Sequence, residues 1–182
     1  MKAISKRISL ALAAVAAVAV FASTSSAQSS KAISLGISGG ASIPVGDFSD
    51  VYKTGYNGTV SLMFNSVGTP LGIRVDGMFN QFSDKDDLII PRPDYRIIGG
   101  NVNLVYALPG TGIRPYLIGG AGYYGQKPDV SGAESVNDFG LNGGLGASFA
   151  LSGFNTFIEA RFHHIMSDAA TQFVPVTFGI SF

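Results

Sequence analysis

Residues 33–43 read ISLGISGGASI, and this stretch decides the fold class of the chain. Isoleucine, leucine and alanine occupy the odd positions, with one glycine among them, whereas only serine and glycine occupy the even positions. Alternation with a period of two is typical of a β-strand that has one apolar and one polar face. The polar face is unusual because it carries no lysine or glutamate, the residues that normally meet water.

The same alternation recurs along the chain and predicts eight strands in all. After the first, the segments cover about 56–65, 71–80, 96–108, 113–124, 138–150, 155–166 and 173–182. Short uncharged turns at 67–70, 109–112 and 151–154 alternate with long links at 44–55, 83–95, 125–137 and 167–172. This rhythm, with strands of roughly 10 to 12 residues, is typical of an all-β, antiparallel, up-and-down transmembrane β-barrel.

The composition limits the classes of protein that the chain can belong to. It has 182 residues, of which 13% are charged, whereas a soluble domain has about 25%. Zero formal net charge without a basic run argues against a nucleic-acid partner. The absence of cysteine excludes a disulfide scaffold, thiol chemistry and a lipid anchor on cysteine.

A soluble barrel with its apolar face inside is the competing interpretation, and the polar face decides between the two. Glycine, serine, threonine and asparagine dominate that face, and small side chains suit the narrow interior of an eight-stranded barrel. Charges on the same face must pair inside the barrel or cost several kcal/mol each. We therefore predict a plugged lumen with three bases facing two acids, and a network of Arg74, Asp76, Arg114, Glu159, Arg161 and His163.

Aromatic residues on the apolar face gather near the strand ends, as the two bilayer interfaces favour. The predicted girdle towards the long links contains Tyr56, Phe79, Tyr123 and Phe139. The predicted girdle towards the short turns contains Phe64, Tyr106, Phe149 and Phe182.

The N-terminus has the organisation of a secretory signal peptide. Lys2, Lys6 and Arg7 precede an apolar stretch at 8–22, and small residues follow it up to Ala27. A membrane anchor would need about 20 apolar residues, and this run is shorter. We expect a cleaved signal peptide at 1–27 and a barrel domain at 28–182, whose net charge is −3.

Three stretches carry a family resemblance: GGASIPVGDFSD at 39–50, RPYLIGGAGY at 114–123 and VPVTFGISF at 174–182. The chain resembles the small outer-membrane β-barrel family typified by OmpX and the OmpA membrane domain. The resemblance implies a location in the outer membrane of a Gram-negative-type bacterium. The C-terminal pattern of Val176, Phe178, Ile180 and Phe182 is similar to the signal that such proteins present to the barrel assembly machinery.

The resemblance also sets the expected partners. These are outer-membrane lipids and lipopolysaccharide, with the barrel assembly machinery and periplasmic chaperones during biogenesis. We expect a monomer that binds no nucleic acid, and we assign no cofactor.

Three functions remain open, because members of such a family include structural proteins, adhesins and a few enzymes. The favoured one is a non-enzymatic barrel with a structural or surface-interaction role. The alternatives are a small passive pore and a lipid A-modifying enzyme that uses His163 or His164. Family deacylases place the serine two residues after the histidine on the same strand face, whereas here residues 165 and 166 are Ile and Met. We therefore expect His163 to point inwards and His164 outwards, and we predict no catalytic residues.

The long links are acidic. With Asp138 at the edge of the third link, they contain ten acidic and four basic residues, a net charge of −6, and this underlies the expected contact role. Asp84, Asp86, Asp87 and Asp94 could hold a divalent cation through their carboxylates. They lack the glycine turn and distal glutamate of an EF-hand loop, so a solvated acidic loop is the expected state and no metal site is assigned.

Overall fold

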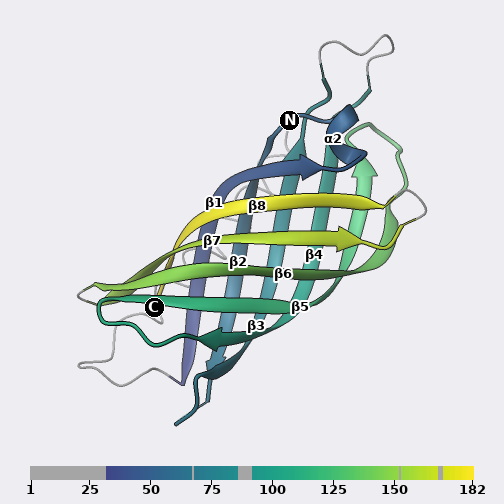
Figure 1. Cartoon of the computed structure of the whole chain (residues 1–182). Helices are drawn as coiled ribbons and strands as arrows, with labels where there is room; N and C mark the ends of the chain where they lie inside the picture. The colour runs from purple at the N-terminus through teal and green to yellow at the C-terminus, as the bar shows by residue number, and fades with distance from the viewer. Residues whose placement is uncertain (1–31, 67, 86–91, 152, 168–169) are drawn as a thin grey trace, which may run out of the picture. The chain divides into compact units, whose positions relative to one another are not determined.

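The alternating segments form eight antiparallel strands that close into a barrel. The computed structural model describes residues 32–66, 68–85, 92–151, 153–167 and 170–182. The strands are β1 (Ile33–Val45), β2 (Gly55–Asn65), β3 (Leu71–Phe82), β4 (Tyr95–Ala107), β5 (Ile113–Pro128), β6 (Val136–Leu151), β7 (Phe154–Ile165) and β8 (Thr171–Ser181). Each strand pairs with its neighbour in sequence, and β8 pairs with β1 (Figure 1). The predicted up-and-down barrel is confirmed, whereas the predicted signal peptide at 1–27 lies outside the described residues.

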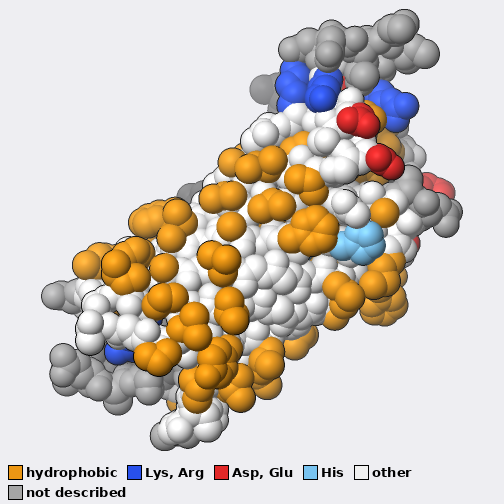
Figure 2. Space-filling model, viewed as in Figure 1, with side chains coloured by type: hydrophobic (Ala, Val, Ile, Leu, Met, Phe, Trp, Pro, Cys, Tyr) orange, Lys and Arg blue, Asp and Glu red, His pale blue; other side chains and the backbone are white. Residues whose placement is uncertain are grey.

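The outer surface of the barrel is apolar. Because side chains alternate between the two faces of a strand, one set of positions points outwards on all eight strands. Its exposed members include Val60, Val102, Leu145 and Phe178. Figure 2 shows hydrophobic side chains spread over the visible barrel wall and charged side chains gathered towards its ends. This inside-out distribution is that of a barrel whose wall faces lipid.

The end of the barrel that carries the long links differs from expectation in two ways. Strands β5 and β6 extend beyond the predicted segments, with Gln126 pairing with Val136, so the link between them is shorter than 125–137. The first link contains a four-residue helix, α2 (Phe48–Val51), and a bridge joins Tyr52 to Asp84 in the second link. No helix within the described part of the chain is both long and apolar enough to span a bilayer.

Apolar side chains also occupy both ends of the lumen, which the small, polar interior face did not predict. Near the short turns, Val105, Tyr116 and Ile118 pack with Met63. Near the long links, α2 contributes to a larger cluster of Phe48, Tyr52, Met78, Phe82, Ile97, Tyr124, Ile165 and Phe173. The polar and charged side chains therefore lie between two apolar layers.

Candidate functional site: the polar lumen

The charged centre of the lumen is built from two strands on opposite walls. Strand β3 carries Arg74 and Asp76, and β7 carries Glu159 and Arg161, each pair two residues apart and facing inwards. In the closed order of eight strands, β3 and β7 lie four positions apart in either direction. Contacts between these two pairs therefore cross the barrel interior.

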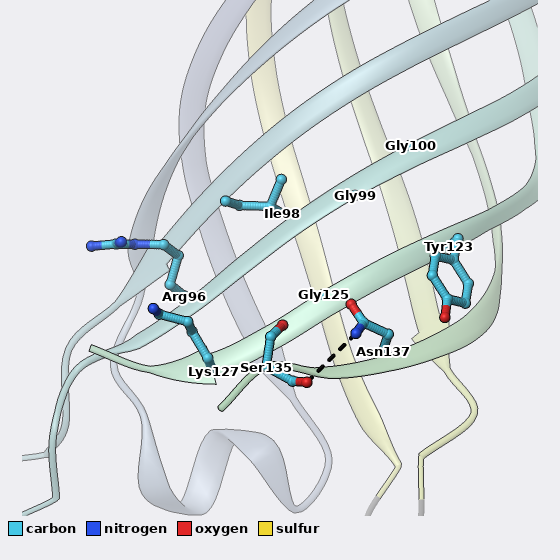
Figure 3. A pocket seen from close by; sticks show the side chains of 9 residues that line it. All are labelled: Arg96, Ile98, Gly99, Gly100, Tyr123, Gly125, Lys127, Ser135 and Asn137. Atoms are coloured by element: carbon cyan, nitrogen blue, oxygen red, sulfur yellow. Dashed lines mark hydrogen bonds between the residues drawn. The ribbon is translucent and has the colours of Figure 1, made fainter. Parts of the chain in front are cut away.

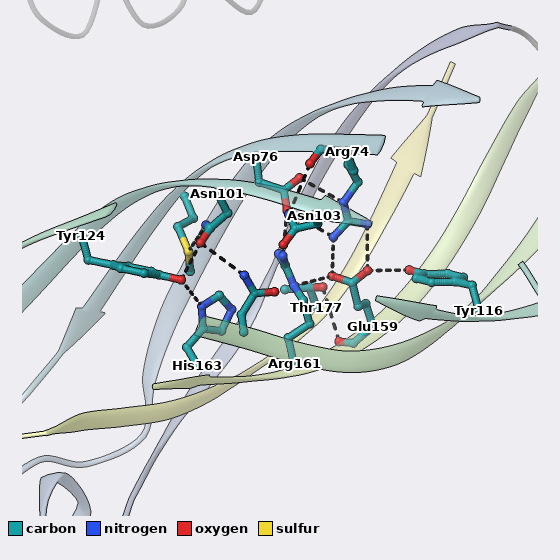
Figure 4. Close-up of polar contacts among 12 residues, drawn as sticks. Arg74, Asp76, Asn101, Asn103, Tyr116, Tyr124, Glu159, Arg161, His163 and Thr177 are labelled. Carbon is teal, nitrogen blue, oxygen red and sulfur yellow. Dashed lines mark hydrogen bonds and ion pairs between the residues drawn. The ribbon is translucent and has the colours of Figure 1, made fainter. Parts of the chain in front are cut away.

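All four charged side chains meet in one buried cluster (Figure 4). Both Nη atoms of Arg74 donate to the Glu159 carboxylate at 2.8 Å, a bidentate pair. Arg161 donates from Nη1 to Asp76 at 2.7 Å, and its Nε lies 2.8 Å from Glu159 Oε1. The Nε of Arg74 lies 3.0 Å from Asp76 Oδ1. Two bases and two acids thus neutralise each other across the lumen.

Neutral side chains complete the hydrogen bonding of the two acids. The Tyr116 hydroxyl donates to Glu159 at 2.7 Å, and the Asn103 amide donates to Asp76 at 2.9 Å. Tyr116 fits because its neighbour on β6 is glycine: a Cβ at Gly146 would lie 2.3 Å from Cζ of the ring. Asn103 and Tyr116 occupy inward positions of β4 and β5, so alternation could have placed both in the lumen, but neither was expected from the sequence because neither is charged.

Arg114 is not part of this cluster, which corrects the expected excess of one base. It belongs to the inward set of β5 by position, but it lies at the second residue of the strand and is exposed. The reason is depth: near the end of a strand, the inward direction leads to an open mouth and solvent. A long cation there needs no buried partner.

His163 lies in the lumen, in a second polar layer closer to the long links. Its Nδ1 is 2.9 Å from the oxygen of the Tyr124 hydroxyl, and that hydroxyl donates its hydrogen to Asn101 Oδ1. The imidazole stacks on Phe173, with ring centroids 4.9 Å apart and planes 11° apart. Tyr124 and Asn101 were missed from the sequence, although alternation puts both on the inward face.

His164 lies on the other side of the barrel wall. It stacks on the outward Phe162 with an interplanar angle of 17°, and its Nδ1 is 3.0 Å from the Gln172 amide nitrogen. The two imidazoles thus point to opposite faces of β7, as the alternation predicts. The neighbour of Nδ1 is the Tyr124 hydroxyl for His163 and the Gln172 amide for His164.

The acidic link of 83–95 contacts the first long link, at 44–55. Asp84 accepts a hydrogen bond from the backbone nitrogen of Arg92 at 3.1 Å, and the Asp84 backbone pairs with Tyr52. Asp86 and Asp87 lie outside the described residues. In the described ranges, no three His, Cys, Asp or Glu side chains come together in a way that could hold a metal ion.

An aromatic group of Phe48 from α2, Tyr52, Phe82 and Phe173, which we call the cap, closes the lumen at this end. Phe48 packs against Tyr52 and Phe82 with ring centroids 4.8 and 5.0 Å away, and Phe82 packs against Phe173 at 5.7 Å. Burial raises the pKa of the Tyr52 phenol, with a smaller opposing effect of Arg92. The phenol therefore stays neutral where the cap packs.

The predicted assembly signal forms the strand that closes the barrel. Val176, Phe178 and Ile180 of β8 pair with Ala41, Gly39 and Ile37 of β1. The backbone of Phe182 exchanges two hydrogen bonds with Leu35, at 2.8 and 3.2 Å. Recognition of these residues by the assembly machinery stays a prediction.

Comparisons with known proteins agree on the architecture. A family model described as an outer membrane protein beta-barrel domain matches residues 9–182. Neisserial surface protein A aligns with a TM-score of 0.66 at 12% identity, covering 85% of this chain and 98% of that one. Ail, the attachment invasion locus protein of Yersinia pestis, aligns with a TM-score of 0.51 at 19% identity, covering 82% and 97%.

The outer membrane enzyme PagL also aligns, with a TM-score of 0.50 at 15% identity, covering 81% of this chain and 97% of that one. A search of curated proteins by similarity found no match. Identities this low establish a shared fold and do not transfer a function. The family model covers nearly the whole chain, and the protein belongs to the outer membrane protein beta-barrel domain family.

Proposed function

We propose that the protein is a non-enzymatic outer-membrane barrel with a closed interior, which acts structurally or through contacts of its acidic long links. One observation carries this proposal: the buried cluster of Arg74, Asp76, Glu159 and Arg161 joins opposite walls of the lumen. A conducting pore needs a continuous water path, and these side chains occupy its centre.

Two further features support a closed interior. The four charges balance and bond to each other, so they do not need water to stabilise them. The cap lies above them, where Phe82 and Phe173 are fully buried. The exposed chemistry of the protein is then confined to its outer wall and its links, where an interaction with the surroundings has to take place.

Planar-bilayer recording tests this proposal against a passive pore. The folded protein should give no discrete conductance steps. The double variant Arg74→Ala, Glu159→Ala removes the central cross-lumen pair and serves as the positive control, provided that it still folds. Steady single-channel steps from the wild-type protein would contradict the closed interior.

The lipid-modifying enzyme remains the second candidate, because the PagL fold resembles this one. Incubation of the folded protein with lipopolysaccharide should release no fatty acid. Release that is lost in both His163→Ala and His164→Ala would contradict the non-enzymatic proposal.

A further inference from the structure

The outer wall carries a hollow near the long links that combines basic and apolar side chains (Figure 3). It has a volume of about 530 Å³ and lies over β4, β5 and the start of β6. Arg96 and Lys127 form its edge nearest the links, and Ile98 and Tyr123 lie on the side of the barrel wall. Arg96, the second residue of β4, was not among the strand charges expected from the sequence.

Arg96 is held in place by three neighbours. Its Nη2 lies 2.8 Å from Asp129, and its Nε donates to the Gln81 side chain at 3.2 Å. The guanidinium also lies over the Phe79 ring, 5.7 Å from the centroid. Asp129 is exposed and takes only one edge of the guanidinium, so the group is positioned without being enclosed.

Lys127 stands directly opposite Arg96 in the register of β4 and β5. It is half-buried, yet no hydrogen bond or ion pair joins its ammonium group to another of the residues that the structure describes. Two cations side by side repel each other, and together with Asp129 they leave a local charge of +1. An anion between them would relieve this repulsion.

Small residues keep the hollow open beside the two cations. Gly125 faces outwards on β5, and a Cβ there would lie 2.9 Å from Asn137 Oδ1 and 3.1 Å from Ser135 Oγ. The serine hydroxyl and asparagine amide are hydrogen-bonding groups at this edge. The hollow therefore offers two positive charges and neutral polar groups to one occupant.

An apolar groove of about 430 Å³ adjoins the hollow, and the two share Ile98 and Gly99. It continues across β3, β2 and β1 between outward side chains, since Phe79 pairs with Ile98 and Ile37 pairs with Val60. Gly77 forms part of its floor, and a Cβ there would meet no atom within 4 Å. The groove lies on the apolar wall of the barrel, away from the links.

We propose that the hollow binds a phosphate of a lipopolysaccharide molecule between Arg96 and Lys127, while one of its acyl chains lies in the adjoining groove. The polar edge near the links and the apolar groove along the wall match a molecule that has an anionic head and hydrocarbon chains. The choice of lipopolysaccharide rests on an orientation with the long links towards the outer leaflet, because long links are typical of the external end of such barrels. The cationic donors of Arg96 and Lys127 suit a phosphate group in particular.

A lipid-binding measurement tests the site on the folded protein in micelles of an uncharged detergent. Fluorescent lipid A should bind, and Lys127→Gln and Arg96→Gln should each weaken binding by about tenfold, the size of one charge-assisted contact. Arg114→Gln, which removes an exposed cation at the opposite end of the barrel, should leave binding unchanged. Equal binding by wild type and Lys127→Gln would overturn the phosphate site.

Further variants test the groove, and other lipids test the source of the phosphate, in the same binding measurement. Gly77→Leu should fill the groove and weaken binding, whereas Gly143→Leu, at an outward glycine of β6 whose Cβ would meet only a carbonyl oxygen at 3.9 Å, should not. Lipid A without its phosphates should bind about tenfold more weakly. Equal binding of phosphatidylglycerol would overturn the choice of lipopolysaccharide. Since the assay needs neither channel recording nor cells, its failure is distinguishable from failure of the proposed function.

Discussion

Glu159 shows how a single residue organises the interior. Its carboxylate accepts from Arg74 and Tyr116 and pairs with Arg161, so it joins three other side chains. In a low-dielectric interior such a group is stable only while its partners remain, because an unpaired buried charge is costly. The same carboxylate would contribute little if it were on the surface, where water screens it.

We expect Glu159→Gln to lower the free energy of unfolding by about 3 to 5 kcal/mol. The amide keeps the shape of the side chain but leaves two arginines with one acid. Urea denaturation of the folded protein in vesicles measures the change as a lower midpoint. Asp129→Asn is the matched control, because it removes a carboxylate from the exposed pair with Arg96 and should shift the midpoint little. Equal midpoints for wild type and Glu159→Gln would mean that water reaches the cluster.

Gly146 and Gly143 offer a second comparison at single positions. Gly146→Ala should destabilise the barrel by about 1 to 3 kcal/mol, because its Cβ would meet the Tyr116 ring. Gly143→Ala, three residues away on the outward face, meets only a carbonyl oxygen at 3.9 Å and should be neutral or slightly stabilising. Denaturation midpoints of the two variants test this difference. An unchanged midpoint for Gly146→Ala would show that the lumen adapts around Tyr116 easily.

At the scale of elements, periodicity predicts some features and not others. A period of two assigns every strand residue to a face, so Arg74, Asp76, Glu159 and Arg161 could be placed inside from the sequence. Their pairing across the lumen requires the closed order of strands. The alternation does not tell how deep in the lumen an inward residue lies. Arg114 is therefore inward in the pattern, although its side chain is exposed near the end of the strand.

The helix α2 had no signal in the sequence for a related reason. Four residues make only about one helical turn, too short for a hydrophobic period to appear. It is held by tertiary contacts of Phe48 and by the bridge between Tyr52 and Asp84. Elements of this kind depend on packing and not on local propensity, so sequence patterns do not reveal them.

We expect Phe48→Ala to open the cap while leaving the barrel folded. The ring packs against Tyr52, Phe82 and Tyr95, and its loss removes the apolar contacts that hold α2 over the lumen. Trypsin should then cleave at Lys53 faster than in the wild type, since the Lys53 backbone bonds to Ser83 only while the links stay together. Tyr56→Ala, which removes an exposed aromatic ring from the outer wall, is the control. Unchanged cleavage in Phe48→Ala would mean that backbone pairing alone holds the cap.

At the scale of the whole molecule, charge is distributed along the barrel axis. The long links carry most of the acidic residues, the short turns at 67–70, 109–112 and 151–154 carry none, and the wall is apolar. This segregation could be predicted from the sequence, because it depends on composition and turn length alone. The hollow at Arg96 and Lys127 could not, because it needs the register of two strands and the absence of a side chain at Gly125.

The segregation of charge also predicts how the barrel is oriented. Short uncharged turns are typical of the periplasmic end of such barrels, and long links of the external end. The chain has no cysteine, so single cysteines can report each end without background. A membrane-impermeant thiol reagent should label Glu134→Cys on intact cells, and should label Thr111→Cys only after the outer membrane is permeabilised; both positions are exposed. Labelling of Thr111→Cys alone on intact cells would reverse the orientation, and the basic hollow would then face the inner leaflet, where lipopolysaccharide is not the available lipid.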